Sequence, residues 1–394
     1  MTHRIAPTRT VALALLVAAA ACLVCIAGPA LAEAKVKKSK GSVVNVMTRN
    51  LYLGADLGPA LGSKSQAEFF EANGAIVRQV EATNFPVRAK GLAQEILEAE
   101  PDLVGLQEVA LWREAPPTLG PVFSGKPEAT KVKYDFLKLL LAQLNKKGTK
   151  YKAVVVQDEF DFEAPANANG VPGDGPGGAG LLANSEVNGR LTMRDVILAR
   201  VGAGVVTSNP TSGNFANPLI VKVAGSKEVS VTRGWTAIDA KVRGSKKFHF
   251  VNSHLEAFDN EAEVPSIRAK QAGELVAPGG PADSKLPVVL LGDFNSDVKT
   301  EVKPGDGQAY RVLTGAGFRE RRKPTPNTCC LETSYDLKTG GGKAEFNHTV
   351  DHVMTDTPKK IKLIDSEVTG LKKPKSGWWD SDHAGVFSSL LLLR

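Results

Sequence analysis

Cysteine is scarce in this chain, and the cysteines that do occur are not spaced for a structural role. The 394 residues include four, of which Cys22 and Cys25 fall in an apolar N-terminal run and Cys329 and Cys330 are neighbours. Neighbouring cysteines bond only through a small strained ring, so a scaffold disulfide is not expected. No Cys-x-x-Cys or partnering histidine spacing accompanies Cys329 and Cys330, which argues against zinc. In an exported protein a strained disulfide and a pair of buried thiols are both open.

Other signals are missing as well. No Gly-x-Ser-x-Gly motif occurs, so a serine-type esterase ranks last among the enzyme classes considered. No internal repeat and no linker interrupts residues 43–394, and large α/β sandwiches reach this length as single domains. We therefore expect one domain over residues 43–394.

Only one long apolar run is present, from Val11 to Ile26. Arg4 and Arg9 precede the run, and Ala30-Leu31-Ala32 follows it as a small-x-small cleavage site. A membrane anchor is disfavoured because the run is short for a spanning helix and nothing like it recurs. We predict that residues 1–32 are a secretory signal peptide and that the protein is secreted.

No strong excess of either charge sign is present. Removal of the signal takes away Arg4 and Arg9 and no acids, so the formal net charge falls from +7 to +5. Residues 33–42 hold much of the excess lysine and are predicted to be a basic leader. A modestly basic chain is suited to a phosphate-bearing polyanion or an anionic membrane, although a lysine-rich solvated surface gives the same count.

A buried strand with a polar end lies at 287–297. Val288 to Leu291 are too few for a helix between Pro287 and Gly292, so they predict a strand buried on both faces. Asp293 and Asn295 follow at a spacing of two, which lets both side chains leave the strand end in one direction. Taken alone, these residues fit an ordinary Asx turn equally well.

Other predicted strands end in the same way, and the repetition indicates a site. Strands are expected at 43–47, 103–107, 248–253, 349–354 and 386–392, besides the one that precedes Asp293. The side chains at or near their ends are Asn50, Glu108, His254, Asp293, Asn295, Asp351, Asp382 and His383. Simple turn residues would include Ser, Thr and Gly, whereas this set contains acids, amides and imidazoles.

The segment 158–193 breaks the alternation of short strands. It begins with acidic and aromatic residues and continues to Gly180 with mostly Gly, Pro, Asn and Ala. We predict an insert loop without packed elements, which in a domain of this kind is a lid, a binding loop or disordered.

In their order, the motifs resemble the endonuclease/exonuclease/phosphatase superfamily, which includes deoxyribonucleases, apurinic endonucleases, bacterial sphingomyelinases and inositol polyphosphate phosphatases. They are Thr-Arg-Asn-Leu (48–51), Gln-Glu-Val (107–109), Asn-Ser-His-Leu (252–255), Gly-Asp-Phe-Asn (292–295), Asp351 and Ser-Asp-His (381–383). The resemblance spans roughly residues 43–394. It implies an α/β fold, a four-layer sandwich of two packed, mainly antiparallel sheets flanked by helices, with the site where strand ends of both sheets meet.

Metal binding follows from the residue types and from the resemblance. Carboxylate and amide oxygens suit Mg²⁺ or Mn²⁺ better than zinc. Mg²⁺ takes few protein ligands, so Glu108 as the main ligand with Asn50 beside it is sufficient, and Asp382 is a candidate to complete the shell.

The resemblance also implies catalytic roles. Asp293 would orient or deprotonate the attacking water and Asn295 would hold the phosphate. His383, oriented by Asp351, would bind a phosphoryl oxygen or protonate the leaving group. The resemblance further implies that His254 is the second imidazole and that Arg233 is a phosphate-contacting arginine.

Together these features predict a secreted Mg²⁺-dependent phosphodiesterase, a monomer with no stable protein partner. Two substrates fit, nucleic acid and phospholipid, and the nuclease-like choice is favoured because the mature chain is basic and shows no clear membrane-binding hairpin. Trp378 and Trp379 would serve base stacking or membrane insertion, or pack in the core. The alternatives are a sphingomyelinase or phospholipase C-like enzyme and a non-catalytic binding module on the same fold.

Overall fold

The computed structural model describes residues 41–393 except 172, 174, 176–179, 181, 224–226, 243–245, 260–262, 299–306, 325, 332–336 and 339–341. The predicted signal peptide and most of the predicted basic leader therefore lie outside the described residues. Gly41 and Ser42, which we assigned to the leader, are the first residues of strand β1 (Gly41–Asn50). The described residues fall within one unit, Ser39–Arg394.

The first sheet has eight strands in the order β15-β16-β1-β2-β6-β3-β4, with β5 along the other edge of β6. Only β1 and β2 run parallel to each other in it. Its other strands are β2 (Leu103–Gln107), β3 (Leu111–Ala115), β4 (Lys131–Asp135), β5 (Tyr151–Ala166), β6 (Val187–Arg200), β15 (Ile361–Thr369) and β16 (Gly385–Leu393).

The second sheet has six strands in the order β13-β14-β12-β11-β10-β7, and only β11 and β12 are parallel. Its strands are β7 (Val205–Asn214), β10 (Gly234–Val242), β11 (Lys247–His254), β12 (Val288–Asp293), β13 (Arg319–Glu320) and β14 (Asp351–Thr355). A separate hairpin is formed by β8 (Leu219–Val223) and β9 (Lys227–Val231). The prediction of two mainly antiparallel sheets is confirmed.

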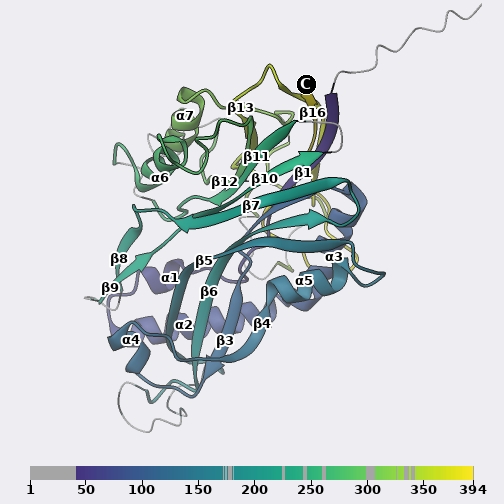
Figure 1. Ribbon diagram of the computed structural model, residues 1–394. Helices are drawn as coiled ribbons and strands as arrows, with labels where there is room; N and C mark the ends of the chain where they lie inside the picture. The colour runs from purple at the N-terminus through teal and green to yellow at the C-terminus, as the bar shows by residue number, and fades with distance from the viewer. Residues whose placement is uncertain are drawn as a thin grey trace, which may run out of the picture. The chain divides into compact units, whose positions relative to one another are not determined.

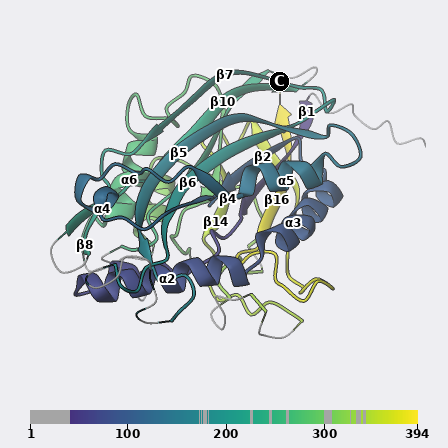
Figure 2. The ribbon, with the colours of Figure 1, turned by 90° about the horizontal axis from the view of Figure 1, so that it is seen from below.

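Helices cover the outer faces of the two sheets (Figures 1 and 2). The described helices are α1 (Gly58–Leu61), α2 (Gln66–Ala82), α3 (Phe85–Ala99), α4 (Gly120–Ser124), α5 (Phe136–Leu144), α6 (Ile267–Val276) and α7 (Gln308–Gly315). Helices α2, α3 and α5 pack on the first sheet, and α6 and α7 pack on the second. None of the helices in the described part of the chain is long and apolar enough to cross a membrane.

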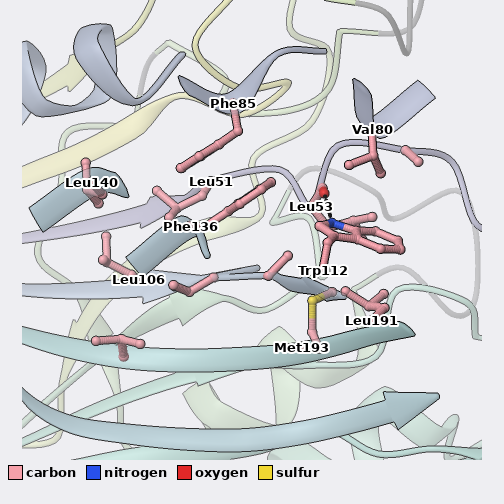
Figure 3. Packing of buried hydrophobic residues seen from close by; sticks show 14 of the residues in the cluster. Leu51, Leu53, Val80, Phe85, Leu106, Trp112, Phe136, Leu140, Leu191 and Met193 are labelled. Carbon is pink, nitrogen blue, oxygen red and sulfur yellow. Dashed lines mark hydrogen bonds between the residues drawn. The ribbon is translucent and has the colours of Figure 1, made fainter. Parts of the chain in front are cut away.

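Three buried apolar clusters separate the four layers. Because strand side chains alternate between faces, Val46 of β1 points into the cluster between the sheets while Met47 joins the cluster under the helices. In that outer cluster the rings of Phe85 and Phe136 stack with centroids 3.5 Å apart, and Trp112 donates a hydrogen bond to the carbonyl of Leu53 at 2.9 Å (Figure 3). The four-layer sandwich is thus held by one dry core between the sheets and one on each outer face.

The two sheets are joined close to their polar strand ends. Gln107 of β2 donates to the side-chain oxygen of Asn252 of β11 at 2.6 Å, and Asn252 donates to the carbonyl of Leu106 at 3.3 Å. Gly105 makes this approach possible, because a Cβ there would overlap the side chains of Leu291 and Asn252. The ends of β2, β11 and β12 are therefore fixed relative to one another.

The prediction of a loop over 158–193 is wrong at both ends, where β5 reaches Ala166 and β6 begins at Val187. The acids and aromatics of the segment alternate along β5. Asp161 pairs with Arg190 across the hairpin, with donor–acceptor distances of 2.9 and 2.5 Å. Phe162 packs edge-on against Phe69 of α2 at 6.0 Å between centroids. Cross-strand ion pairing and burial of the side chains at 163–166 stabilise a hairpin in spite of the polar composition.

Helix α2 was not predicted from the sequence. Ser65 caps the helix by accepting a hydrogen bond from the backbone N–H of Glu68. Phe69, Ile76 and Val80 are buried on one side of it. Their spacing of seven and four residues, about two turns and one turn of helix, was a signal for a helix.

Candidate active site

Strand ends from both sheets meet at one place. In the second sheet His254, Asp293 and Asp351 lie side by side at the ends of β11, β12 and β14. In the first sheet Asn50 pairs with Gln107, the residue before Glu108. Direct or electrostatic contacts link all the residues that we predicted for the site. The structure therefore brings this set together from segments far apart in the chain.

Asp293 lies at the centre of the group. Its Oδ2 accepts a hydrogen bond from Asn50 at 2.9 Å and lies 3.6 Å from Nε2 of both His254 and His383. Its Oδ1 accepts the backbone N–H of Asn295 at 2.9 Å. The residue before it must be glycine, because a Cβ on Gly292 would overlap a carbonyl of the neighbouring strand. Burial raises the pKa of Asp293, and the nearby His383 opposes this increase only in part.

His383 is held in a charged state by carboxylates. Its Nδ1 lies 3.0 Å from Asp351 Oδ2, and Arg49 donates to its backbone carbonyl at 2.5 Å. Burial by itself lowers the pKa of His383, but Asp351 and Asp293 outweigh burial and hold that pKa well above its ordinary value. This raised pKa favours the imidazolium at neutral pH, in which Nε2 is a donor 3.6 Å from Asp293 Oδ2 and 3.4 Å from Cys329 Sγ.

His254 is held in the neutral state. Burial, and after it the cation of Arg233, lower the pKa of His254 well below its ordinary value. Arg233 can only donate, so His254 Nδ1, at 3.2 Å from its guanidinium, accepts. The neutral ring then carries its proton on Nε2, where Asp293 Oδ2 is the acceptor at 3.6 Å; the side-chain nitrogen of Asn295, 3.1 Å from Nε2, is itself a donor and is not a hydrogen-bond partner in this tautomer.

Arg233 is enclosed by protein rather than open to a ligand. It is 5% exposed, and two of its nitrogens lie 3.4 Å from the oxygens of Glu256. Its third contact is His254. The structure thus places the arginine behind an imidazole, whereas the sequence led us to expect a contact with phosphate.

Two further buried acids lie near Arg233, and sequence reasoning missed both. The carboxyl oxygens of Glu159 and Asp195 are buried with few hydrogen-bond donors among the described residues, of which the backbone N–H of Gly234 acts on Glu159. Burial raises the pKa of Glu159 to about 8 and the pKa of Asp195 well above its ordinary value, and the proximity of Glu159 raises that of Asp195 further. Asp195 directly precedes the apolar run Val196 to Ala199, which shows that it lies in a strand but not that it faces a buried cation.

Glu108, Asn50 and Asp382 form the oxygen cluster, named for their side-chain oxygens. Glu108 has a positive φ of 54°, and its carboxylate accepts from Leu53 N–H at 2.6 Å and from Asn50 at 3.2 Å. Burial, the largest influence, raises the pKa of Asp382 to about 6. The nearby His383 lowers this pKa, and the negative charge of Glu108 raises it. Two carboxylates that repel each other beside an amide oxygen fit a hard divalent cation, which would relieve the repulsion. The carboxylates and imidazole of Asp293, Asp351 and His383 also have ligand atoms within 4.8 Å of one another.

Residues 68–383 match the profile of the Endonuclease/Exonuclease/phosphatase family. The chain belongs to this family. Its members are phosphoric ester hydrolases, so the site just described is the place where such chemistry is expected. A sequence search of curated proteins found no significant match.

Solved structures with this fold are similar to the chain over most of its length. A Bacteroides thetaiotaomicron protein of the family is 13% identical with a TM-score of 0.50, covering 90% of this chain and 96% of the other. A Beutenbergia cavernae protein of the family is 15% identical with a TM-score of 0.50, and the match covers 89% of this chain and 72% of the other. A mannosyl-6-phosphatase from Bacteroides thetaiotaomicron is 14% identical with a TM-score of 0.47, and the match covers 88% of this chain and 99% of the other. At these identities the likeness shows the endonuclease/exonuclease/phosphatase fold and nothing finer.

A buried arginine ties the two halves of the oxygen cluster together in this family member. Arg88 of α3 donates to the carbonyls of Leu51 at 2.7 Å, Tyr52 at 3.1 Å and Asp380 at 2.9 Å. These carbonyls follow Asn50 and precede Asp382 in the chain. Arg88 therefore fixes the distance between two predicted metal ligands without touching either one. The residue was not recognised in the sequence, because a lysine or arginine near a helix start is ordinarily exposed.

Two predicted features turn out to be scaffolding. Asp259, near His254 in the sequence, accepts the backbone N–H groups of Ile267 and Arg268 at 3.0 and 2.8 Å and so satisfies the first N–H groups of α6, beside the N-cap Ser266. Trp379 is 2% exposed and packs in a small cluster with Tyr52, while Trp378 is half-buried. For Trp379 the core alternative is the correct one.

Proposed function

We propose that the protein is a secreted phosphodiesterase that requires Mg²⁺ or Mn²⁺ and cleaves nucleic acid by in-line attack of water. The observation that carries the proposal is the position of Asp293, a buried carboxylate 3.6 Å from each of two imidazoles and hydrogen-bonded to Asn50 of the oxygen cluster. Phosphodiester hydrolysis needs a base for the water, positive charge at the phosphate oxygens and a proton for the leaving oxygen. Each of these tasks has a candidate here.

The oxygen cluster would hold the cation. Glu108 and Asp382 would bind through their carboxylates and Asn50 through its amide oxygen, which now accepts the backbone N–H of Tyr52 at 2.8 Å. A cation bound there supplies charge neutralisation at the phosphate oxygens.

Asp293 would orient the water and take its proton. The hydrogen bonds from Asn50 and from the N–H of Asn295 fix its carboxylate plane. Its raised pKa makes it a stronger base than an exposed aspartate, which favours proton transfer near neutral pH.

The two imidazoles would share the phosphoryl group. His383, kept charged by Asp351, would donate from Nε2 to a phosphoryl oxygen or to the leaving oxygen. His254 would donate from its neutral Nε2, with Asn295 beside it to hold the phosphate. In this proposal Arg233 positions His254 and does not itself contact the substrate, because its guanidinium is already engaged by protein groups.

A phospholipid is the second candidate substrate, and one observation favours it. The β8–β9 hairpin belongs to neither large sheet and carries Ile220 at 54% exposure. Phe123, 61% exposed, is linked to it because its carbonyl accepts from Lys227 at 3.5 Å. Exposed apolar side chains next to a lysine are suited to a lipid surface. The mature net charge of +5 favours nucleic acid.

The test is hydrolysis of supercoiled plasmid DNA, sphingomyelin vesicles and bis-p-nitrophenyl phosphate by the mature chain. We expect nicking of the plasmid with Mg²⁺, no nicking after chelation with EDTA, and recovery when Mg²⁺ or Mn²⁺ is restored. Full activity in EDTA would contradict the metal requirement. Cleavage of vesicles without nicking of DNA would replace the nuclease by the lipid enzyme, and no hydrolysis of any of the three would favour the binding module.

Secretion rests on the sequence of residues 1–32. Expression of the full chain in a bacterial host should release protein whose N-terminus is Glu33 into the exported fraction. Retention of an uncleaved chain in the cytoplasm would contradict it.

A further inference from the structure

The two cysteines of the predicted mature chain lie against the candidate active site. Cys329 and Cys330 form a disulfide, Cys329 is buried, and Cys330 is half-buried. The Sγ of Cys329 lies 3.4 Å from Nε2 of His383, the ring nitrogen that Asp351 leaves free. None of the roles given above uses this pair.

The segment that carries the cysteines is fixed to the segments that carry His383 and Asp351. The carbonyl of Thr328 accepts the N–H of Ala384 at 2.7 Å, and Leu331 N–H donates to the carbonyl of Asp382 at 3.2 Å. The hydroxyl of Thr328 accepts the N–H of Asp351 at 3.2 Å. The sulfurs are therefore held next to the imidazole by the backbone on both sides of them.

The spacing of the ligand atoms fits a thiophilic cation. The candidate atoms of Cys329, Cys330 and His383 all lie within 4.8 Å of one another. Zinc–sulfur and zinc–nitrogen bonds in a tetrahedral site place sulfur and nitrogen about 3.5 Å apart, close to the observed distance. Two thiolates on the same zinc lie about 3.8 Å apart, so the disulfide must be open for both to bind. The Asp351–His383 hydrogen bond is the arrangement that orients metal-binding imidazoles.

We propose that reduction of the Cys329–Cys330 disulfide opens a site for Zn²⁺ or Cd²⁺, formed by both thiolates and His383 Nε2, and that occupation of this site inhibits the enzyme. A dithiol or phosphine reductant supplies the two electrons; with a phosphine, the disulfide and one water become two thiols and a phosphine oxide. Binding then releases both thiol protons and any proton on Nε2. The inhibition rests on the proposed function, whereas the binding does not.

The two cation sites differ in chemistry, which keeps their occupants apart. Glu108, Asn50 and Asp382 offer only oxygen, which suits Mg²⁺, while thiolates and imidazole select Zn²⁺ and Cd²⁺. A cation on His383 Nε2 removes the donor that the phosphoryl group needs. A disulfide has no comparable affinity for Zn²⁺ or Cd²⁺. In the oxidised protein, Nε2 of His383 therefore stays free of these cations.

The test compares oxidised and reduced mature chain. Reduction by a trialkylphosphine, desalting and titration with Cd²⁺ should give one retained cadmium more per reduced chain than per oxidised chain, with a cadmium–thiolate charge-transfer band in the ultraviolet. The Cys329→Ser and Cys330→Ser variants, treated identically, should lose the band and bind about tenfold or more weakly. Absence of the band in reduced wild type, or the same cadmium retention in both serine variants, would overturn the site.

Inhibition is measured separately, with Mg²⁺ in excess. Because Cd²⁺ can also compete for the oxygen cluster, the oxidised protein is the control for that competition. We expect reduced protein to lose about tenfold more activity at the same Cd²⁺ concentration than oxidised protein. Equal loss in both would overturn the inhibitory part. If no substrate is hydrolysed at all, the proposed function fails, while the band still decides the binding site.

Discussion

The two histidines of the site lie at the same distance from Asp293 and yet are held in opposite charge states. Nε2 of each is 3.6 Å from Asp293 Oδ2. His254 has the Arg233 cation at its other nitrogen, and His383 has the Asp351 carboxylate there. The first arrangement lowers the imidazole pKa and the second raises it. The partner at Nδ1, rather than burial, distinguishes the two rings, because both are buried.

This difference in charge fits the two tasks proposed for the site, acceptance of a proton from water by Asp293 and stabilisation of the phosphoryl oxygens by His383. In the proposed mechanism, a neutral ring on one side would leave Asp293 free to accept a proton from water, and a charged ring on the other would stabilise the phosphoryl oxygens. Two charged rings would hold Asp293 ionised and weaken it as a base, whereas two neutral rings would leave the leaving group without a proton donor. We therefore expect the largest losses when the shared carboxylate is removed and smaller ones when either partner is removed.

Asp293→Asn removes the shared carboxylate. The amide cannot accept a proton from water, so kcat/KM should fall about 10³-fold or more, with little change in melting temperature because Asn keeps the shape of the side chain. Hydrolysis of bis-p-nitrophenyl phosphate and a thermal melt measure both quantities, and the exposed Asp365→Asn serves as the matched control. A fall in melting temperature parallel to the loss of activity would assign Asp293 a structural role instead.

Asp351→Asn acts on the charged ring. Without the carboxylate at Nδ1, the pKa of His383 drops, since Asp351 is the first of the groups that raise it. Because activity requires the imidazolium, the alkaline limb of the kcat/KM profile should move to lower pH by about one unit or more. At pH 8 the loss should be about tenfold to a hundredfold, and it should shrink as the pH falls. An unshifted alkaline limb would show that the charge on His383 is not used.

Arg233→Met acts on the neutral ring. Without the cation, the pKa of His254 rises toward its ordinary value, so the acid limb of the profile should move to higher pH. Arg233→Lys keeps the charge and should leave that limb in place. Both variants should melt at lower temperature because the buried Glu256 loses its bidentate partner, and the exposed Arg311→Met should change neither property. Identical acid limbs in the Met and Lys variants would contradict the electrostatic role of Arg233.

Sequence reasoning located the polar strand ends but not what surrounds them. Asn50, Glu108 and His254 could be placed because a short apolar run followed by a polar residue predicts a strand end locally. The charge states of the rings could not be predicted, since Arg233 and Asp351 come from other segments of the chain. Glu159 and Asp195 were passed over for the same reason, because no local pattern shows that an acid in a strand faces a buried cation. The extension of β5 and β6 into the segment 158–193 was missed because the segment is rich in polar residues, glycine and proline, which ordinarily indicate a loop.

The cysteine pair shows the same limit at the level of chemistry. Two adjacent cysteines predicted neither a scaffold disulfide nor a metal site, and their oxidation state was open. Only the contact of Cys329 with His383 gives the pair a connection to the site. That contact depends on how residues 328–331 are hydrogen-bonded to two distant segments, which spacing along the chain does not encode.

The protonation states of His254 and His383 can be measured directly, by nitrogen-15 NMR of the imidazole rings in the folded mature chain at pH 7. His254→Gln and His383→Gln spectra assign the signals among the histidines. We predict two protonated nitrogens in His383 and one protonated and one bare nitrogen in His254. Equal protonation of the two rings would contradict the proposal that Asp293 works between a neutral and a charged imidazole.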